Sequence, residues 1–156
     1  MTVLKPNEAK LKRAVEHITY EIDMFRYAVK NLSSGDNHDN LLRNVLIESF
    51  VVHAYNLFKF FYLSKKDKTK ATDIIVGHYI NNQKNFNKNR SSKNVLEGIV
   101  GKRNKQLAHL TYSRIYRNKK TKPWKISMIS KNIEKTISAF LDSLSNDKKK
   151  WFEYKN

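Results

Sequence analysis

An arginine and a histidine stand six positions apart in the segment Arg103–His109, which reads RNKQLAH. An arginine guanidinium can clamp a phosphate with its planar fork of donors, and a histidine imidazole can move protons near neutral pH. The 156-residue chain carries 31 Lys and Arg against 14 Asp and Glu, a formal charge of +17. A phosphate clamp beside a proton shuttle in so basic a chain indicates chemistry on a polyanion such as RNA.

The two side chains need a particular backbone arrangement in order to meet. Asn104 is a good N-cap residue, so a helix that begins there leaves Arg103 outside it and places His109 in its second turn. Residues six apart on a regular helix point about 120° away from each other. Either the backbone breaks at Gly101 and lets Arg103 fold back, or a second copy of the chain supplies its own pair. Lys105, one turn before His109, adds positive charge on the His109 face.

Arg103 and His109, with Asn104 directly after the arginine, resemble the arginine–spacer–histidine motif of the HEPN superfamily of helical ribonucleases and nucleotide-binding domains. The resemblance extends loosely over most of the chain, as two long helices followed by shorter ones with the motif on a late helix. It implies a metal-independent endoribonuclease, without a cofactor, in which the motif helices of a homodimer form one cleft. The RNA 2′-OH would attack the adjacent phosphodiester and leave a 2′,3′-cyclic phosphate and a 5′-OH.

The resemblance also implies a role for each motif residue. His109 would act as general acid or base, Arg103 would stabilise the charge that develops on the phosphorane, and Asn104 would orient either one. RNA rather than DNA follows as the substrate, because only RNA carries the internal nucleophile. Many members of the family are toxins or antiviral defence effectors held in check by a partner, which implies a neutralising protein or RNA. Cations near the motif are candidates for contacts with the RNA backbone: Lys102, Arg114, Arg117, Lys119 and Lys120.

Helices are the elements that must position this motif. Pro6-Asn7 begins a first helix, whose apolar residues recur at spacings of three and four until Ser33-Ser34-Gly35-Asp36 ends it. A second helix, from about Asp39 to Ser64, is apolar nearly all round, which is typical of the centre of a bundle or of an oligomer interface. A third long helix follows Pro123-Trp124 and carries isoleucines at the same spacings. The sequence therefore predicts a single all-α domain over residues 1–156, a HEPN-like bundle of two or three long helices with shorter ones.

The segments between the long helices have weaker patterns. Thr72-Asp73 can cap a short helix that extends to Ile80. The polar, Asn-rich tract Asn81–Asn94 predicts a loop, which would suit contact with a phosphate backbone. Val95–Val100 predicts a short helical turn that Gly101 ends, and the basic tail Asp147–Asn156 predicts a further helix after a break.

The second helix also carries polar residues that its apolar surroundings do not explain. Ser49, His53 and Asn56 follow one another at spacings of four and three, and Glu48 precedes Ser49. Buried polar groups need partners, so one interpretation is a hydrogen-bonded seam that fixes how the long helices pack. In the other interpretation His53 or Glu48 lines the cleft of the motif in a supporting role, and Glu48 orients Arg103 or a catalytic histidine.

Several classes of site are absent from the sequence. There is no cysteine, which excludes disulfides and thiolate metal sites and fits a reducing cytoplasm. Met1–Lys10 lacks the apolar core of a signal peptide, and the longest apolar segment, Val45–Leu63, is too often interrupted by polar residues to predict a membrane span. The five His form no compact metal-ligand pattern, and no phosphate-binding loop or serine-nucleophile elbow occurs.

Two other functional classes remain open on the same residues. A non-catalytic RNA-binding or regulatory protein that keeps the HEPN-like fold predicts tight, salt-sensitive RNA binding without cleavage. A protein-interaction module that assembles through the apolar second helix predicts a large dimer interface and no affinity for RNA. The basic charge is also compatible with a solvated surface kept for solubility.

Overall fold

The computed structural model describes residues 6–34, 39–63, 73–94, 96, 99 and 124–153. Throughout these ranges all regular structure is helical, which confirms the predicted all-α class. The elements are α1 (Glu8–Ser33), α2 (Asn40–Tyr62), the 3₁₀ turn η1 (Val76–His78), α3 (Gln83–Asn89), α5 (Ile126–Asp142) and α6 (Asn146–Glu153).

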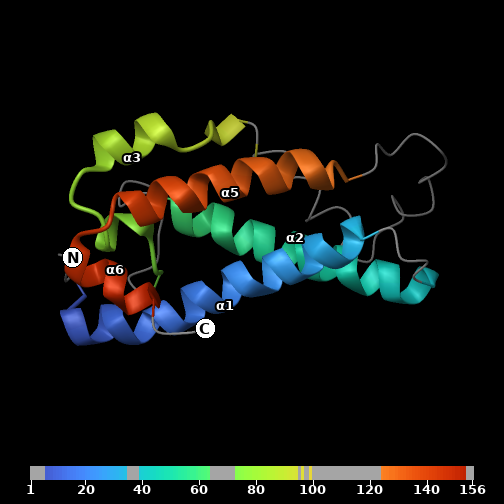
Figure 1. Cartoon of the computed structure of the whole chain (residues 1–156), viewed down its shortest axis with the longest axis horizontal. Helices are drawn as coiled ribbons and strands as arrows, with labels where there is room; N and C mark the ends of the chain where they lie inside the picture. Colours follow the sequence, from blue (N-terminus) through green and yellow to red (C-terminus); the bar gives the residue numbers. More distant parts are fainter. Residues whose placement is uncertain are drawn as a thin grey trace.

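Helices α1 and α2 lie side by side and antiparallel (Figure 1). Each begins at a capping side chain: Asn7 Oδ1 accepts from the backbone N–H of Lys10 at 2.9 Å, and Asp39 Oδ1 accepts from that of Leu42 at 2.7 Å. The predicted starts of both helices are thereby confirmed. One face of α1 is buried along most of its length, through Leu11, Val15, Ile18, Ile22, Phe25 and Ala28.

Helix α5 runs alongside α2 (Figure 1) and packs against its second half through Phe140. Phe140 of α5 is fully buried, and its ring lies 5.4 Å from that of Phe60, 5.8 Å from that of Phe61 and 5.4 Å from that of Phe152 on α6. Helix α2 therefore contacts α1, η1 and α5, and its last turns bury Phe58, Phe60, Phe61 and Tyr62. Leu41, Leu42 and Val45 in its first turns, and Val52 near its middle, are exposed.

The Asn-rich tract was predicted as a loop, and that prediction is wrong: residues 83–89 form α3. Asn82 caps the helix by accepting from the backbone N–H of Asn85 at 3.0 Å, and Phe86 anchors it by full burial in the core. Side-chain amides one turn apart also bond to each other, as Gln83 does to Asn87 at 3.2 Å. The helix predicted from residue 72 to Ile80 is only the 3₁₀ turn η1, with an extended Ile75 before it.

Tyr79 joins η1 to α1, because its buried hydroxyl donates to the backbone carbonyl of Leu11 at 3.0 Å. Burial raises the pKa of the Tyr79 phenol. Above about pH 10 the unfolded chain loses this proton while the folded chain keeps it, so the free energy of unfolding falls as the pH rises.

The Tyr79→Phe variant is expected to weaken that alkaline dependence. Wild-type stability should fall more steeply above about pH 10, by up to about 1.4 kcal/mol per pH unit, than that of the variant. Below that pH the variant should be less stable by about 1 kcal/mol, because one hydrogen bond is lost. Urea unfolding at a series of pH values checks both effects, and parallel pH profiles for the two proteins would contradict the assignment.

Candidate nucleic-acid site

The Arg103–His109 motif lies outside the described residues, so its geometry stays a prediction. The same holds for the Asn104 cap, the break at Gly101 and the neighbouring cations, namely Lys102, Lys105, Arg114, Arg117, Lys119 and Lys120. The chain enters and leaves the stretch 100–123 at residues packed on the core. Before it, Leu96 and Ile99 are helical and buried, and after it Trp124 packs against the same cluster.

A polar seam joins α1 to α2 within the described part of the chain. His53 Nδ1 lies 2.7 Å from Glu21 Oε2, and the side-chain amide of Asn56 donates to the same oxygen at 3.1 Å. The His53 ring also meets the Tyr20 ring edge-on, with centroids 5.6 Å apart. His53 is buried and Glu21 is partly buried. The predicted seam of hydrogen-bonded polar residues is therefore present at His53 and Asn56.

The seam orients the His53 imidazole. An Nδ1–H can donate to the Glu21 carboxylate, which sets the direction of the ring. The His53 ring lies between α1 and α2, and the Asn56 amide of α2 donates to the Glu21 carboxylate of α1 across the same interface. Sequence reasoning singled out His53 but missed Glu21, which is 32 residues earlier on α1. The available signal was a carboxylate bordering the apolar stripe of α1, next to Ile22.

Glu48 and His53 do not lie on one face of α2. Residues five apart on a helix point about 140° away from each other, and accordingly Glu48 is exposed whereas His53 is buried against α1. Glu48 lies on the exposed part of the helix with Val45 and Val52. The structure thus brings His53 to the α1 interface and leaves Glu48 at the surface.

A second polar cluster, formed by Tyr62, Arg90, Ser91 and Thr136, lies at the end of α2. The Arg90 guanidinium donates to the backbone carbonyl of Phe61 at 2.7 Å and lies 4.3 Å from the centre of the Tyr62 ring. The Tyr62 hydroxyl donates to the carbonyl of Ser91 at 2.8 Å and lies 3.2 Å from Thr136 Oγ1 of α5. Burial lowers the pKa of Arg90 and raises that of Tyr62. This cluster satisfies backbone carbonyls and ties α5 to α2.

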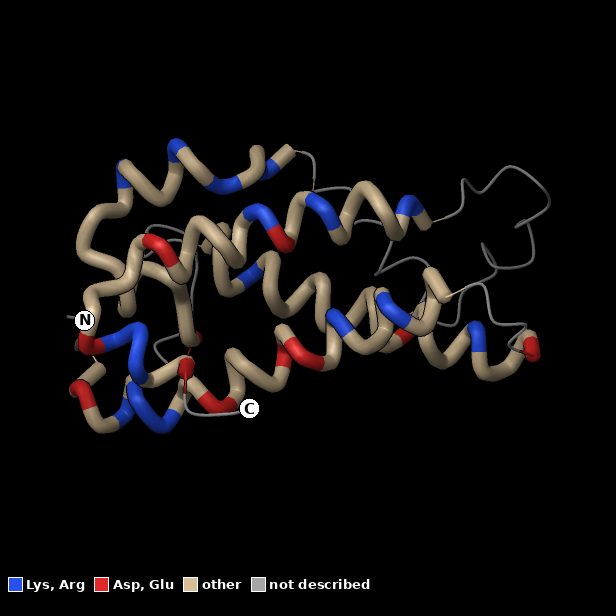
Figure 2. Tube along the Cα trace, in the orientation of Figure 1, with Lys and Arg blue, Asp and Glu red and all other residues tan. Residues whose placement is uncertain are grey.

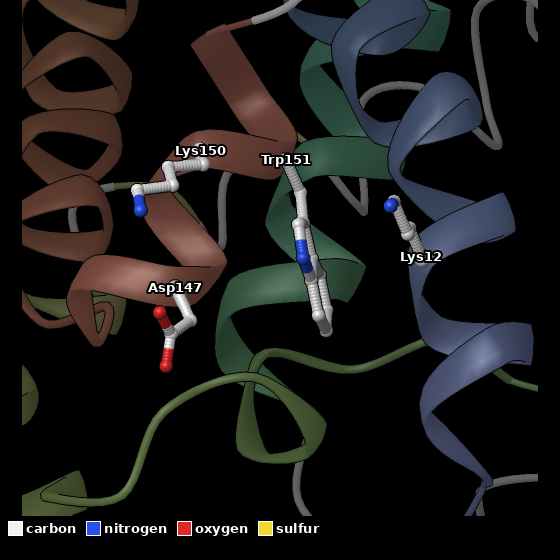
Figure 3. Close-up of a pocket in the computed structure, with 4 residues that line it drawn as sticks. All are labelled: Lys12, Asp147, Lys150 and Trp151. Carbon is white, nitrogen blue, oxygen red and sulfur yellow. The ribbon is translucent and has the colours of Figure 1, made fainter.

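A hollow with two lysines in its lining lies between the start of α1 and α6. Lys12, Asp147, Lys150 and Trp151 line it, with a volume of about 470 Å³ (Figure 3). A second hollow of about 360 Å³ shares Asp147 and Trp151 with the first and continues toward Pro6 and His78. In Figure 2 the lysines of α6 lie close to the basic first turns of α1. The sequence predicted the helix of this tail but not the hollow, because the hollow depends on where α6 packs.

The described residues were also compared with the requirements of a metal site and of a membrane span. No group of three or more His, Asp and Glu able to hold a metal occurs among them. None of the helices that the structure describes is long and apolar enough to cross a membrane. No known protein family, curated protein or solved structure matches the chain.

Proposed function

We propose that this chain is a metal-independent endoribonuclease that cleaves RNA by attack of the 2′-OH at a site shared by two protomers. The observation that carries the proposal is the Arg103–His109 motif in an all-helical chain of charge +17. In this reaction His109 moves the proton of the 2′-OH or of the leaving oxygen, and Arg103 stabilises the phosphorane, with Asn104 in support. Neither residue requires a metal for these roles.

Pairing of two protomers is part of the proposal, because Arg103 and His109 diverge on a regular helix. The exposed apolar face of α2 supports it: Leu41, Val45 and Val52 are 75%, 54% and 44% exposed. Their spacings of four and seven place them along one stripe of the helix. Exposed apolar side chains along one face favour association, so this α2 face, on which Glu48 lies between Val45 and Val52, is a candidate contact between the two copies.

The biological setting follows from the resemblance to the HEPN superfamily. A ribonuclease of this kind would serve as a toxin or antiviral defence effector in the cytoplasm. A neutralising protein or RNA partner would hold its activity in check. The high positive charge suits both an RNA substrate and an acidic inhibitor.

The test is incubation of the purified 156-residue chain with total RNA in the presence of excess EDTA. We expect the wild-type chain to cleave RNA in EDTA. Cleavage should stop when both Arg103 and His109 are replaced by alanine. Any co-purifying partner is first removed under denaturing conditions, and the chain is refolded. If the refolded wild-type chain leaves the RNA intact, the result contradicts the proposal.

A second function is favoured by the basic hollow beside Trp151. A non-catalytic RNA-binding or regulatory protein would need such a surface but no competent motif. It predicts binding that weakens steeply with salt, with RNA left uncut under every condition. The same incubation, followed by a gel-shift measurement, separates the two functions.

A further inference from the structure

The hollow between α1 and α6 contains the parts of a site for an unpaired base and its phosphates. We infer that Trp151 stacks on a base of single-stranded RNA while Lys12 and Lys150 contact the flanking phosphates. The inference rests on the RNA partner of the proposed function but not on cleavage, and it uses none of the residues of the Arg103–His109 motif.

Trp151 stands between two hollows, because it borders both the 470 Å³ and the 360 Å³ space. Its indole is partly buried and packs against the hydrophobic core. Figure 3 shows it extending from α6 into the space next to Lys12 of α1. Hollows of about 300–1,000 Å³ are typical of small-ligand sites, and an aromatic ring accepts any base by stacking.

The charges around the first hollow suit an anion. Lys12 and Lys150 reach it from two different helices and are both exposed, against the single carboxylate of Asp147. The second hollow is lined by Glu8 and Asp147 as well as Lys148, and Lys148 donates to the backbone carbonyl of Tyr79 at 2.7 Å. The first hollow therefore combines a partly buried aromatic ring with two exposed ammonium groups, as sites that track a single-stranded backbone do.

A membrane surface fits this region less well than a nucleic acid does. Helices that bind lipid surfaces present large apolar side chains outward. The described residues of α6 and of α1 up to residue 19 include no exposed large hydrophobic side chain. Trp151 is partly buried and lines a hollow instead of projecting from the surface.

The experiment measures binding of a 2′-deoxy oligonucleotide of about 12 nucleotides, a length that a single-strand site can span and that lacks the nucleophile needed for cleavage. The chain has two Trp, so the Trp124→Phe variant leaves Trp151 as the only tryptophan fluorophore. Stacking is expected to quench its emission, and added salt is expected to reverse the quenching. If the oligonucleotide binds the chain but the emission of Trp151 does not change, the inference is overturned.

Substitutions at the ring distinguish stacking from packing. Trp151→Leu keeps an apolar side chain but removes the stacking ring, and is expected to weaken binding by about 5-fold to about 150-fold. Trp151→Phe keeps a ring and should bind closer to the wild type than Trp151→Leu does. Circular dichroism and urea unfolding confirm that each variant is folded. Equal affinity of Trp151→Leu and wild type overturns the inference.

Substitutions at the lysines have a matched control. Replacing Lys12 and Lys150 with alanine should lower the slope of log affinity against log salt by about 1.4, the value for two phosphate contacts on a single strand. Lys131 and Lys135 are exposed on α5, and replacing them removes the same charge from a different helix. An equal slope change for both pairs overturns the inference, because net charge alone would then explain binding.

Two further outcomes complete the test. Vesicles containing phosphatidylserine are the alternative ligand. If they quench the emission of Trp151 and the oligonucleotide does not, the hollow binds a lipid surface, and the inference is overturned. Intact quenching in a chain that cuts no RNA would defeat the nuclease proposal and leave this site standing. Normal cleavage without any response of Trp151 would defeat only this site.

Discussion

Replacing His109 with alanine is expected to lower the rate of RNA cleavage by about 10²- to 10⁴-fold, the usual contribution of a positioned general acid or base. Arg103→Ala should cost about 10²- to 10³-fold, as the loss of a donor to a developing oxyanion does. The Arg103→Lys variant should recover little of that loss, because lysine keeps the charge but lacks the planar fork. Single-turnover cleavage of a labelled RNA in EDTA measures all three rates.

The control for these variants is His17→Ala, which removes an exposed histidine of α1 and should leave the rate unchanged. A mixture of Arg103→Ala and His109→Ala chains, unfolded and refolded together, should cleave faster than either alone if two protomers share one site. Wild-type rates in the His109→Ala chain would remove the histidine from the reaction. The absence of any gain on mixing would count against the shared site.

Phe140→Ala is expected to lower the free energy of unfolding by about 3–5 kcal/mol, the usual cost of truncating a buried phenylalanine. Phe140 is fully buried, and its ring meets four others: Phe60, Phe61, Tyr79 and Phe152. Alanine leaves a cavity where α2, η1, α5 and α6 converge. The loss is a large part of the about 5–15 kcal/mol that stabilises a domain, and urea unfolding measures it.

Met128→Ala serves as the control on the same helix, because Met128 is 39% exposed. Its expected effect lies within about 0.5 kcal/mol. A loss below about 1 kcal/mol for Phe140→Ala would contradict the packing of the aromatic cluster. It would also remove the support for α6 as a fixed wall of the basic hollow, because Phe152 of α6 contacts Phe140 directly.

The long helices could be predicted because their signals are local. The apolar stripe of α1 and the capping residues Asn7 and Asp39 mark helix faces and starts without any knowledge of the rest of the chain. The short α3 could not be predicted in the same way. Its asparagines disfavour helix interiors, and what stabilises it is the burial of Phe86, a tertiary contact.

The candidate sites depend on contacts between distant segments, which a pattern along the chain does not contain. His53 stood out as a polar residue on an apolar helix, but its partner Glu21 lies on α1 and became visible only when the two helices were packed together. Trp151 and Lys150 stood in a basic, aromatic tail, whereas Lys12 joins them from the other end of the sequence. Arg103 and His109 were predicted from their types and spacing, and their meeting across two protomers remains a prediction.

The chemical ends of the RNA fragments produced in EDTA show whether the 2′-OH is the nucleophile. A 2′-OH attack leaves a 2′,3′-cyclic phosphate and a 5′-OH, and it fails on a substrate with a single 2′-deoxyribose at the cut position. Both results are expected for the wild-type chain, and His109→Ala should form the same products about 10²- to 10⁴-fold more slowly. Fragments with 5′-phosphate and 3′-OH ends, or cleavage that needs added Mg²⁺, would contradict the proposed function.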